Sequence, residues 1–406
     1  MTLPGGDAAN SAGGVKPRLR IAVFNRTFST AGGGAERYSV ALVEQLAAAH
    51  DIHVFAQEIA HQWPGVTYHR VSMPLRKPRW INQLWFAACT WWATRQGFDV
   101  VHSHENTWHG DVQTVHVLPV RHTLFTERQG FRKALRWVKV ASSPRLLAYL
   151  LLERLRFTPQ VGRLVVVTSD ALRSIMASAY PACQRSVSVI TPGIHLPVLP
   201  ITLMRRTNAR ALLGLPQDAK CILFVANDYR KKGLTTLLRA LARCPDDFIL
   251  VVVGNGSQQG FFMDMRRKLG LESRVVFLGS LKNVAQAYEA ADCLAHPTLE
   301  DTFAMVVLEA MSYGLPVIVS SPRYCGISGL LSHGSNALVL SDPQDPVELH
   351  HALEQVLDQT GVSAHLSRGA LEFANQYQWA GIARQQEMLY CDVVASRHGA
   401  STVAPL

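Results

Sequence analysis

Two carboxylates stand at the ends of an apolar stretch in the second half of the chain. Asp301 and Glu309 lie eight positions apart, and "DTFAMVVLE" has almost no other polar side chain. Asp301 falls in a loop after an expected strand, and the residues from Ala304 onward predict a helix. A helix start favours an anion, and a carboxylate accepts hydrogen bonds from sugar hydroxyls. The stretch therefore suits a nucleotide diphosphate that carries a sugar, although a capping acid followed by an ion-paired helix residue is the simpler alternative.

A basic loop, "DYRKKG" at 228–233, offers cations for the same diphosphate. Arg230, Lys231 and Lys232 stand between an expected strand and a helix that starts near Gly233. This loop is expected beside the acidic stretch, because the carboxyl ends of parallel strands share one edge of a sheet. Guanidinium and ammonium groups neutralise phosphate. A solvated surface loop is the alternative.

Three consecutive glycines in "GGGAER", at 32–37, follow the first expected strand. Gly33 and Gly34 have no side chains, so their backbone can approach a ligand closely before the next helix begins. The segment predicts a further contact with the phosphates, with a plain turn as the alternative.

Short apolar runs alternate with helical patterns along the whole chain, which is typical of parallel strands joined by crossover helices. The expected strands are 20–25, 51–56, 99–104, 112–117 and 163–168 in the first half, and 221–227, 248–254, 274–279, 292–297, 316–321 and 337–340 in the second. Three prolines and a glycine at 189–200 mark a hinge between two such units. We therefore expect an α/β fold of two facing Rossmann-like domains, with a ligand cleft at the carboxyl ends of both sheets.

The expected division of the chain has five parts. A disordered tail at 1–17 precedes an N-terminal domain at 18–190 and a C-terminal domain at 191–375. A helix at 376–395 is expected to pack back on the N-terminal domain, and a tail follows at 396–406.

The composition is that of a globular protein, with 48% hydrophobic and 17% charged residues among 406. No apolar run reaches the roughly 18 residues that span a membrane. The first residues lack the apolar core of a signal peptide, and the seven cysteines are scattered without a C-x-x-C pair. Both features predict a reduced, cytoplasmic setting.

These motifs together resemble the retaining glycosyltransferases of family 4, which have the GT-B architecture of two facing Rossmann-like domains. The resemblance covers about residues 18–395 and rests on "GGGAER", "TPGI" at 191–194, "DYRKKG", "VVVGNG" at 251–256, "FLGSL" at 277–281 and the acidic stretch from 296 to 318. Within the family, the chain is most similar to the glucosyltransferases of the lipopolysaccharide core. The resemblance implies an acceptor-binding N-terminal domain and a nucleotide-sugar-binding C-terminal domain.

The resemblance assigns roles to the two acids. The family's paired glutamates fall on Asp301 and Glu309, so the first is an aspartate in this chain. Glu309 is expected to hold the ribose of the donor, and Asp301 to face the donor sugar or its phosphate side. Glu300 is the neighbouring candidate for the role of Asp301.

The resemblance also assigns the remaining site residues. Lys232, together with Lys231 or Arg230, matches the basic pair that neutralises the diphosphate. Gly33 and Gly34 match the glycine loop that touches the phosphates when the cleft closes. His116, in "QTVHVLP", matches a position near the reacting centre.

The implied reaction breaks the bond between the anomeric carbon of a sugar and a diphosphate. The helix start at Ala304, Met305 and Val306 and the lysine pair would stabilise the departing charge without a metal ion. Transfer in this family is thought to proceed by front-face attack, in which the leaving phosphate helps to deprotonate the acceptor. Because the chain has no Asp-x-Asp motif of the metal-dependent glycosyltransferases, we expect neither a metal nor another cofactor.

Two further motifs offer different chemistry. "GNGSQQG" at 254–260 follows a strand, but its glycine spacing and the lack of an acid after the next strand disfavour a dinucleotide cofactor. The histidines of "HSHENTWHGDVQTVH" at 102–116 offer a zinc site, which would favour a hydrolase. The resemblance instead makes this segment two strand ends in the cleft.

Positive charge is in excess by 10 and is concentrated between residues 121 and 156. In "FRKALRWVKV", Arg132, Arg136 and Lys139 share one side of a helix and apolar residues share another, as in helices that lie on anionic membranes. An earlier helix would add interfacial anchors through Trp80, Trp85, Trp91 and Trp92. A helix that packs on its domain and faces solvent is the alternative. Nucleic acid is not an expected partner, because no motif for it occurs.

The sequence thus predicts a cytoplasmic enzyme, peripheral on the inner face of the cytoplasmic membrane. It would move a hexose from a nucleotide sugar, UDP-glucose above all, to a lipopolysaccharide core or related surface glycan. GDP-mannose or UDP-N-acetylglucosamine are the alternative donors. A protein that binds nucleotide sugars without turnover is a further alternative, because Asp301 stands where the family has a glutamate.

Overall fold

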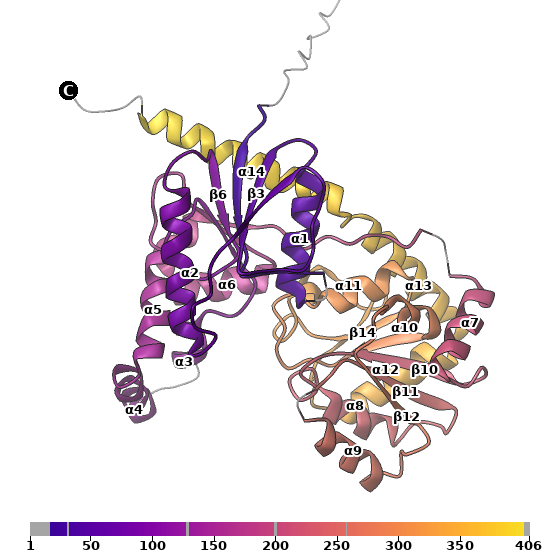
Figure 1. The fold of residues 1–406 in the computed structure, drawn as a ribbon. Helices are drawn as coiled ribbons and strands as arrows, with labels where there is room; N and C mark the ends of the chain where they lie inside the picture. The colour runs from indigo at the N-terminus through magenta and orange to yellow at the C-terminus, as the bar shows by residue number, and fades with distance from the viewer. Residues whose placement is uncertain (1–16, 31, 127–129, 199–200, 257, 402–406) are drawn as a thin grey trace, which may run out of the picture.

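The computed structural model describes residues 17–30, 32–126, 130–198, 201–256 and 258–401. Two parallel β-sheets, each covered by helices, form the cores of an N-terminal and a C-terminal domain (Figure 1). The expected tails therefore lie outside the described residues, except for residue 17 and for 396–401, which continue the last helix.

The N-terminal sheet has the strand order β5-β3-β1-β6-β7-β8-β9, with parallel pairing throughout. Its strands are β1 (Arg20–Phe24), β3 (Asp51–Ala56), β5 (Val66–Arg70), β6 (Val100–Ser103), β7 (Val112–Val115), β8 (Leu164–Val167) and β9 (Val187–Val189). Two short strands, β2 (Thr27–Phe28) and β4 (Glu58–Ile59), pair outside this sheet. Helices cover both faces, so the central strands β6 and β7 are buried at every position, although each also contains two polar residues.

The C-terminal sheet has the order β12-β11-β10-β13-β14-β15, again in parallel. Its strands are β10 (Lys220–Val225), β11 (Phe248–Val253), β12 (Val275–Gly279), β13 (Cys293–His296), β14 (Val317–Ser320) and β15 (Leu338–Leu340). In both sheets the strand order reverses beside the first strand, at β1/β6 and at β10/β13. Ligands bind outside the carboxyl ends of the strands at such a reversal.

The helices connect these strands and cover the sheets. Those of the N-terminal domain are α1 (Gly34–Leu46), α2 (Arg79–Thr94), α3 (Val120–Phe125), α4 (Gly130–Ala141), α5 (Pro144–Arg156), α6 (Asp170–Ala179) and the 3₁₀ helix η1 (Pro181–Ser186). Those of the C-terminal domain are α7 (Leu203–Leu213), α8 (Leu234–Leu241), α9 (Gln259–Lys268), α10 (Ala285–Ala290), α11 (Met305–Ser312), η2 (Gly326–Leu330), α12 (Pro346–Asp358) and α13 (Thr360–Asn375).

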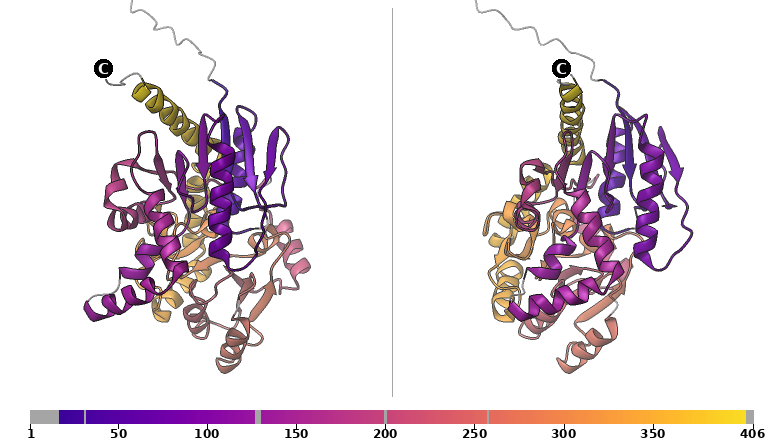
Figure 2. Two further views of the ribbon diagram at one scale, coloured as in Figure 1. Left: turned by 60° about the vertical axis from the view of Figure 1, so that its left-hand side comes forward. Right: turned by 90° about the vertical axis from the view of Figure 1, so that its left-hand side faces the viewer.

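The last helix, α14 (Trp379–Ser401), crosses from the C-terminal domain to the N-terminal domain (Figures 1 and 2). It contacts α1 and β6, and its Trp379, Tyr390 and Val393 belong to the core of the N-terminal domain. It runs to Ser401, so the end expected at 395 is wrong.

The two crossings of the chain between the domains lie side by side. The amide of Ile194 donates to the carbonyl of Tyr377 at 2.7 Å, and the amide of Trp379 donates to the carbonyl of Ile194 at 3.3 Å. Gly193 fits closely there, since a Cβ atom on it would lie 2.7 Å from Cδ2 of Trp379. The segment expected as a hinge is thus bonded to the start of α14.

The sequence missed β5 and β9, which are edge strands of the N-terminal sheet. Val66–Arg70 is nowhere fully buried, and Val187–Val189 is only three residues long. An edge strand with one solvated face has no continuous apolar run, so the pattern used for the central strands does not detect it.

Candidate active site

A cleft of about 610 Å³ lies between the two domains, at the carboxyl ends of both sheets. The N-terminal domain lines it with the glycine loop, the start of α1 and the end of β7, and the C-terminal domain with the loops after β10 and β13 and the start of α11. The expected site residues that line it are Gly33, Gly34, His116, Lys232, Asp301, Ala304, Met305 and Val306.

Asp301 uses both carboxylate oxygens to fix the loop before α11. Oδ1 accepts the amides of Phe303 at 3.2 Å and Ala304 at 2.8 Å, while Oδ2 accepts from Nζ of Lys232 at 2.6 Å and from Nε2 of His296 at 3.3 Å. Burial favours the neutral acid, but the hydrogen bond from His296 and the charge of Lys232 outweigh it and hold the pKa of Asp301 well below its usual value. Asp301 is therefore an anion at the cleft wall that holds the loop before α11, and no side chain caps the helix itself.

The start of α11 carries backbone strain. Ala304 has φ 72°, and it is the one non-glycine residue with positive φ in the described part of the chain. Such a conformation costs about 1–2 kcal/mol for a residue with a Cβ, and the hydrogen bond to Asp301 holds it in place. Strain of this kind collects at ligand sites. Here it lies at the start of α11, whose first residues line the cleft, where the helix dipole favours an anion.

Only one of the three cations of the basic loop lines the cleft. Lys232 reaches it, and its Nζ also donates to the carbonyl oxygen of Glu300 at 2.9 Å. Lys231 pairs instead with the Glu300 carboxylate at 2.9 Å, and Arg230 lies over the ring of Phe261. Lys231 and Arg230 do not line the cleft because consecutive residues of a loop point in different directions.

The glycine loop faces the start of α11 across the cleft. Gly33 caps α1 and Gly34 is its first residue. A Cβ on Gly34 would lie 3.8 Å from Cγ of Met305, so the two domains meet at this point. A phosphate held at the start of α11 would also contact the backbone of this loop.

Glu309 lies deeper than expected and does not line the cleft. It is 8% exposed, and each of its oxygens already has a partner. Nη1 of Arg37 donates to Oε1 at 2.6 Å, and the hydroxyl of Tyr288 donates to Oε2 at 2.6 Å. Arg37 comes from α1 of the N-terminal domain, so this pair links the two domains. A carboxylate has about four acceptor positions, which leaves room for a further donor.

His116 enters the cleft from the end of β7 and is backed by a second histidine. Its Nε2 lies 2.9 Å from Nδ1 of His104, and the two rings stack 5.2 Å apart. His104 Nε2 is buried without a partner, and a buried lone pair is tolerated better than a buried N–H. His104 therefore donates from Nδ1 to His116, which leaves the proton of His116 on Nδ1.

Both histidines are neutral. Burial, reinforced by the charge of Arg156, lowers the pKa of His116 to about 3. Burial and the neighbouring histidines hold the pKa of His104 well below its ordinary value. His116 is thus a neutral hydrogen-bond donor at the cleft.

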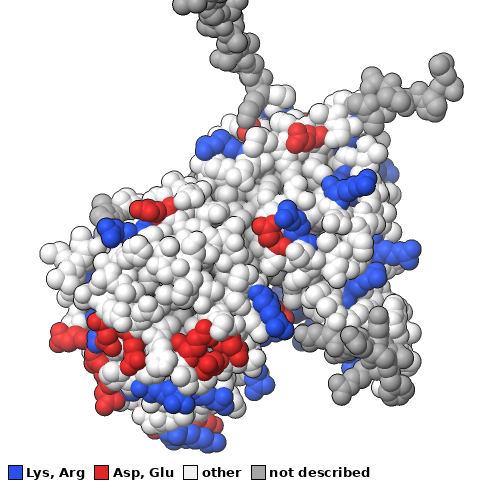
Figure 3. Space-filling view, turned by 180° about the vertical axis from the view of Figure 1, so that it is seen from behind, with Lys and Arg blue, Asp and Glu red and all other residues white. Residues whose placement is uncertain are grey.

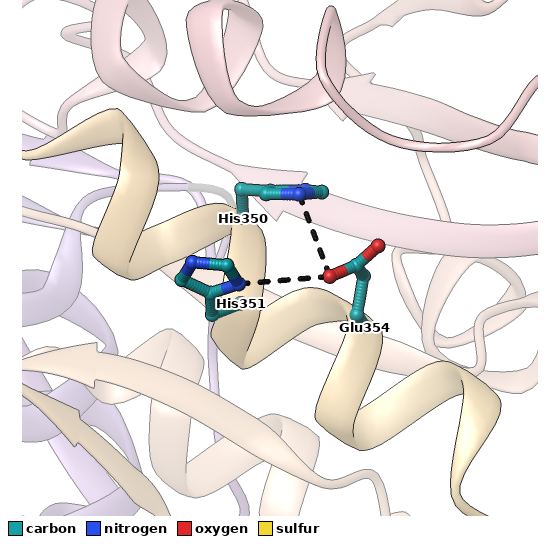
Figure 4. A group of neighbouring side chains, drawn as sticks. All are labelled: His350, His351 and Glu354. Atoms are coloured by element: carbon teal, nitrogen blue, oxygen red, sulfur yellow. Dashed lines mark ion pairs between the residues drawn. The ribbon is translucent and has the colours of Figure 1, made fainter.

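The histidine segment at 102–116 holds no group of three metal ligands among the described residues. His102 bonds instead to the hydroxyls of Tyr390 and Thr114, both at 2.6 Å. The one group with metal-ligand proximity in the described chain is on α12, where His350 and His351 lie 3.4 and 3.7 Å from a Glu354 oxygen (Figure 4). It takes no part in the cleft.

Sequence reasoning missed four residues that complete the site: Arg37, His104, Tyr288 and His296. Arg37 had a signal, since it lies on the first turn of the helix after the glycines. His296 is the last residue of β13 and so stands at the carboxyl edge of the sheet. Tyr288 lies on a short helix and had no signal.

Two facing Rossmann-like domains with this cleft define a glycosyltransferase of the GT-B architecture. Residues 32–197 match the family model described as Glycosyltransferase Family 4, and residues 205–373 match the one described as Glycosyl transferases group 1. By both of its halves, the chain belongs to the group 1/family 4 glycosyltransferases.

Relatives and solved structures agree with this assignment. The D-inositol 3-phosphate glycosyltransferase of Corynebacterium diphtheriae is 28% identical over 313 residues, 73% of this chain and 71% of the relative. The structure of WaaG, a glycosyltransferase involved in lipopolysaccharide biosynthesis, has a TM-score of 0.77 at 21% identity, covering 90% of this chain and 98% of that one. Anabaena HepE in complex with UDP-glucose has a TM-score of 0.72 at 18% identity, covering 93% and 100%. At these identities the two structures support the fold.

Proposed function

We propose that the chain transfers glucose from UDP-glucose, with retention and without a metal ion, to a lipopolysaccharide core or related surface glycan. The observation that carries the proposal is the meeting of Lys232, the start of α11 and the glycine loop in one cleft. Together they supply a cation, a helix N-terminus and a bare backbone to a diphosphate. The complex of HepE with UDP-glucose supports UDP-glucose as the donor. The stated involvement of WaaG in lipopolysaccharide biosynthesis supports a lipopolysaccharide core as the acceptor.

In this proposal the diphosphate lies between the glycine loop and α11. When the anomeric bond breaks, negative charge grows on the leaving phosphate, and Lys232 with the amides of Met305 and Val306 stabilises it. Asp301 keeps Lys232 in place and contributes its charge on the side of the donor sugar. The acceptor hydroxyl attacks from the same face and gives its proton to the leaving phosphate, so the configuration is retained.

His116 and Glu309 position the donor. The Nδ1–H of His116 donates to a hydroxyl of the transferred sugar, which orients the ring without adding charge. Glu309 does not line the cleft as it stands, so it accepts from the ribose hydroxyls only when the ion pair with Arg37 opens; its oxygens keep acceptor positions that Arg37 and Tyr288 leave free. Removing an interaction of this kind to a charged group costs about 1.5–3 kcal/mol, which is roughly tenfold to a hundredfold in affinity.

Release of nucleoside diphosphate from a panel of nucleotide sugars, with and without glycolipid extracts, tests the proposal. We expect release from UDP-glucose that an extract stimulates and that Glu309→Gln weakens through a higher KM for the donor. Faster release from GDP-mannose or UDP-N-acetylglucosamine would make that nucleotide sugar the donor in place of UDP-glucose. Thermal stabilisation by donors with no release from any of them would favour the binding protein without turnover.

We further propose that the protein is cytoplasmic and peripheral on the inner face of the cytoplasmic membrane. No helix in the described part of the chain is long and apolar enough to cross a bilayer. Helix α4 projects from the body of the N-terminal domain (Figures 1 and 2). Its Trp137 and Val138 are 53% and 67% exposed, and Lys139 is exposed beside them. Apolar side chains next to a cation suit an anionic lipid surface.

Neighbouring helices extend this surface. Exposed apolar side chains of α2 and α5 are Trp85, Trp91, Trp92, Leu147, Leu151 and Leu155. Trp80 is half-buried, and the side chain of Arg132 lies outside the described residues. Seen from behind, the outer edge of the N-terminal domain carries mainly Lys and Arg, whereas the lower C-terminal domain carries Asp and Glu together with Lys and Arg (Figure 3). The cationic edge would turn the N-terminal domain toward an anionic membrane.

Co-sedimentation with vesicles that contain phosphatidylglycerol tests the membrane proposal. Arg136→Glu/Lys139→Glu on α4 should reduce the bound fraction strongly, at about 1 kcal/mol for each cation near the surface. Arg267→Glu/Lys268→Glu on α9 makes the same change of charge on the C-terminal domain and should have little effect. Equal losses in both variants would show that net charge, and not the α4 surface, governs binding.

A further inference from the structure

We propose that the N-terminal domain carries an arginine-lined subsite for a phosphate group on the acceptor. This inference rests on the proposed function, because it names the chemistry of the acceptor. Two adjoining cavities, of about 570 and 370 Å³, lie where β1, β3 and β5 end. They share four lining residues: Gln57, Glu58, Met73 and Arg76.

The floor of these cavities is a fixed pair of amides. Gln57 and Asn82 are 4% and 6% exposed. Nε2 of Gln57 donates to Oδ1 of Asn82 at 2.7 Å, and Nδ2 of Asn82 donates back to Oε1 of Gln57 at 2.9 Å. Gln57 also donates to the carbonyl of Ser72 at 3.1 Å, which holds the loop after β5. The cavities are therefore part of the folded core and not a gap between mobile side chains.

The walls carry more positive than negative charge. Arg26 lines the smaller cavity, but its Nε pairs with Glu105 at 2.9 Å, so that charge is balanced. Arg70, Arg76 and Arg79 are exposed, and no described residue forms an ion pair with them. Among the described lining residues, Glu58 is the one acid that faces these three cations.

This chemistry selects a phosphate. The planar guanidinium binds phosphate through two parallel hydrogen bonds, and arginine is more weakly hydrated than lysine. Arg79 is also the first residue of the 16-residue helix α2, whose positive end lies at the cavity. A neutral sugar would leave these cations without a counter-charge.

The position fits an acceptor and not the donor. The cavities share no residue with the donor cleft, yet both lie at the same edge of the N-terminal sheet. β6 lies between β1 and β7, and the loop after β6 supplies Glu105, which anchors Arg26. A glycan with its phosphate among the arginines would extend along this edge toward His116 at the end of β7.

Acceptor kinetics test the subsite. The probes are a lipopolysaccharide core extract in neutral detergent and the same extract freed of phosphate by hydrofluoric acid. We expect Arg76→Gln/Arg79→Gln to lower the ratio of kcat/KM for the phosphorylated over the dephosphorylated extract at least about tenfold. Lys77→Gln removes a neighbouring exposed cation that lines neither cavity and should leave the ratio unchanged. An unchanged ratio in the double variant would overturn the proposal.

A binding measurement separates this inference from the proposed function and from a lipid source. By saturation-transfer NMR, native protein should bind glucose 6-phosphate but not glucose, and the double variant should lose that binding, even if no donor is ever turned over. If native protein does not bind glucose 6-phosphate in preference to glucose, the proposed subsite is wrong. If the double variant loses sedimentation with phosphatidylglycerol vesicles but keeps the phosphate preference, the arginines serve a lipid headgroup and the acceptor assignment is wrong.

Discussion

At the scale of single residues, the direction of one hydrogen bond decides what His116 can do. The tautomer that leaves the lone pair of His104 on its unpartnered Nε2 makes His104 the donor to Nε2 of His116, which leaves an N–H on Nδ1 of His116. A neutral donor can hold a sugar hydroxyl, whereas the opposite tautomer would present an acceptor. His104 is thus a positioning residue that does not itself line the cleft.

Replacing His104 tests this role. His104→Phe keeps a flat ring against Tyr38 and His116 but removes the donor, so we expect kcat to fall about tenfold to a hundredfold, the cost of one such bond. His104→Gln retains an N–H donor and should recover most of the rate. Steady-state kinetics should place the loss of His104→Phe in kcat and not in the KM for the donor. Equal losses in both variants would mean that the rate does not depend on the N–H donor of His104.

The residue scale also shows what sequence reasoning can reach. Asp301 and Lys232 were placed at the cleft because loops that follow parallel strands meet at one edge. The ion-pair partner of Glu309 could not be predicted from the sequence, because Arg37 is 272 positions away and belongs to the other domain. Pattern reasoning places elements, but a contact between domains depends on how they face each other.

At the scale of elements, the turn into α8 depends on a glycine. Gly233 caps the helix directly after Lys232 with φ 85°, and a Cβ there would lie 1.8 Å from the carbonyl oxygen of Pro297. The backbone of the β13 loop therefore packs directly on this turn. The approach of these two loops brings Lys232 to Asp301.

Gly233→Ala should accordingly destabilise the C-terminal domain by several kcal/mol and lower Tm, because backbone must move to admit the methyl group. Gly214→Ala is the matched control: Gly214 ends α7 with φ 66°, and nothing lies within 4 Å of the added Cβ. That change should cost only the conformational strain, about 1–2 kcal/mol. Thermal unfolding of both variants measures the difference. Similar losses of Tm would show that crowding at Gly233 is relieved cheaply.

The ends of β6 and β7 and the loop between them carry histidines that must stay neutral in the folded protein. Burial comes first among the causes that lower the pKa of His102, His109 and His116 to about 3 each. In an unfolded chain the pKa of histidine is about 6.5. Between these values the unfolded state binds more protons, so stability is full above pH 6.5 and is lost as pH falls toward 3.

His109→Phe tests this assignment. Both ring nitrogens of His109 are buried without a partner, and the ring lies against Phe24, so the substitution removes no hydrogen bond. We expect similar stability at pH 7.5 and a shallower fall in stability between pH 6 and 4, by up to about 1.4 kcal/mol per pH unit. Denaturant unfolding as a function of pH measures the slope.

At the scale of the whole molecule, three polar contacts between described residues join the two domains across the cleft. The hydroxyl of Thr302 donates to the carbonyl of His116 at 2.7 Å, and the hydroxyl of Ser169 donates to the carbonyl of Thr302 at 2.8 Å. The ion pair of Arg37 and Glu309 is the third. All three join the domains, whereas the two chain crossings at Ile194 and Trp379 lie together and are bonded to each other.

These contacts predict that closure has a small, adjustable free energy. Ser169→Ala/Thr302→Val removes two neutral hydrogen bonds of about 0.5–1.5 kcal/mol each, enough to shift the ratio of closed to open molecules about 5-fold to 150-fold. The radius of gyration by small-angle X-ray scattering should rise in the variant and return when UDP-glucose is added, because a donor that contacts both domains binds the closed form better. Ser174→Ala/Thr158→Val removes two hydroxyls that bond only within the N-terminal domain and should leave the radius of gyration unchanged. If Ser169→Ala/Thr302→Val stays compact without donor, the contact of Gly34 with Met305 and the Arg37–Glu309 ion pair are sufficient for closure. Donor binding would then need an opening step that the hydroxyls of Ser169 and Thr302 do not control.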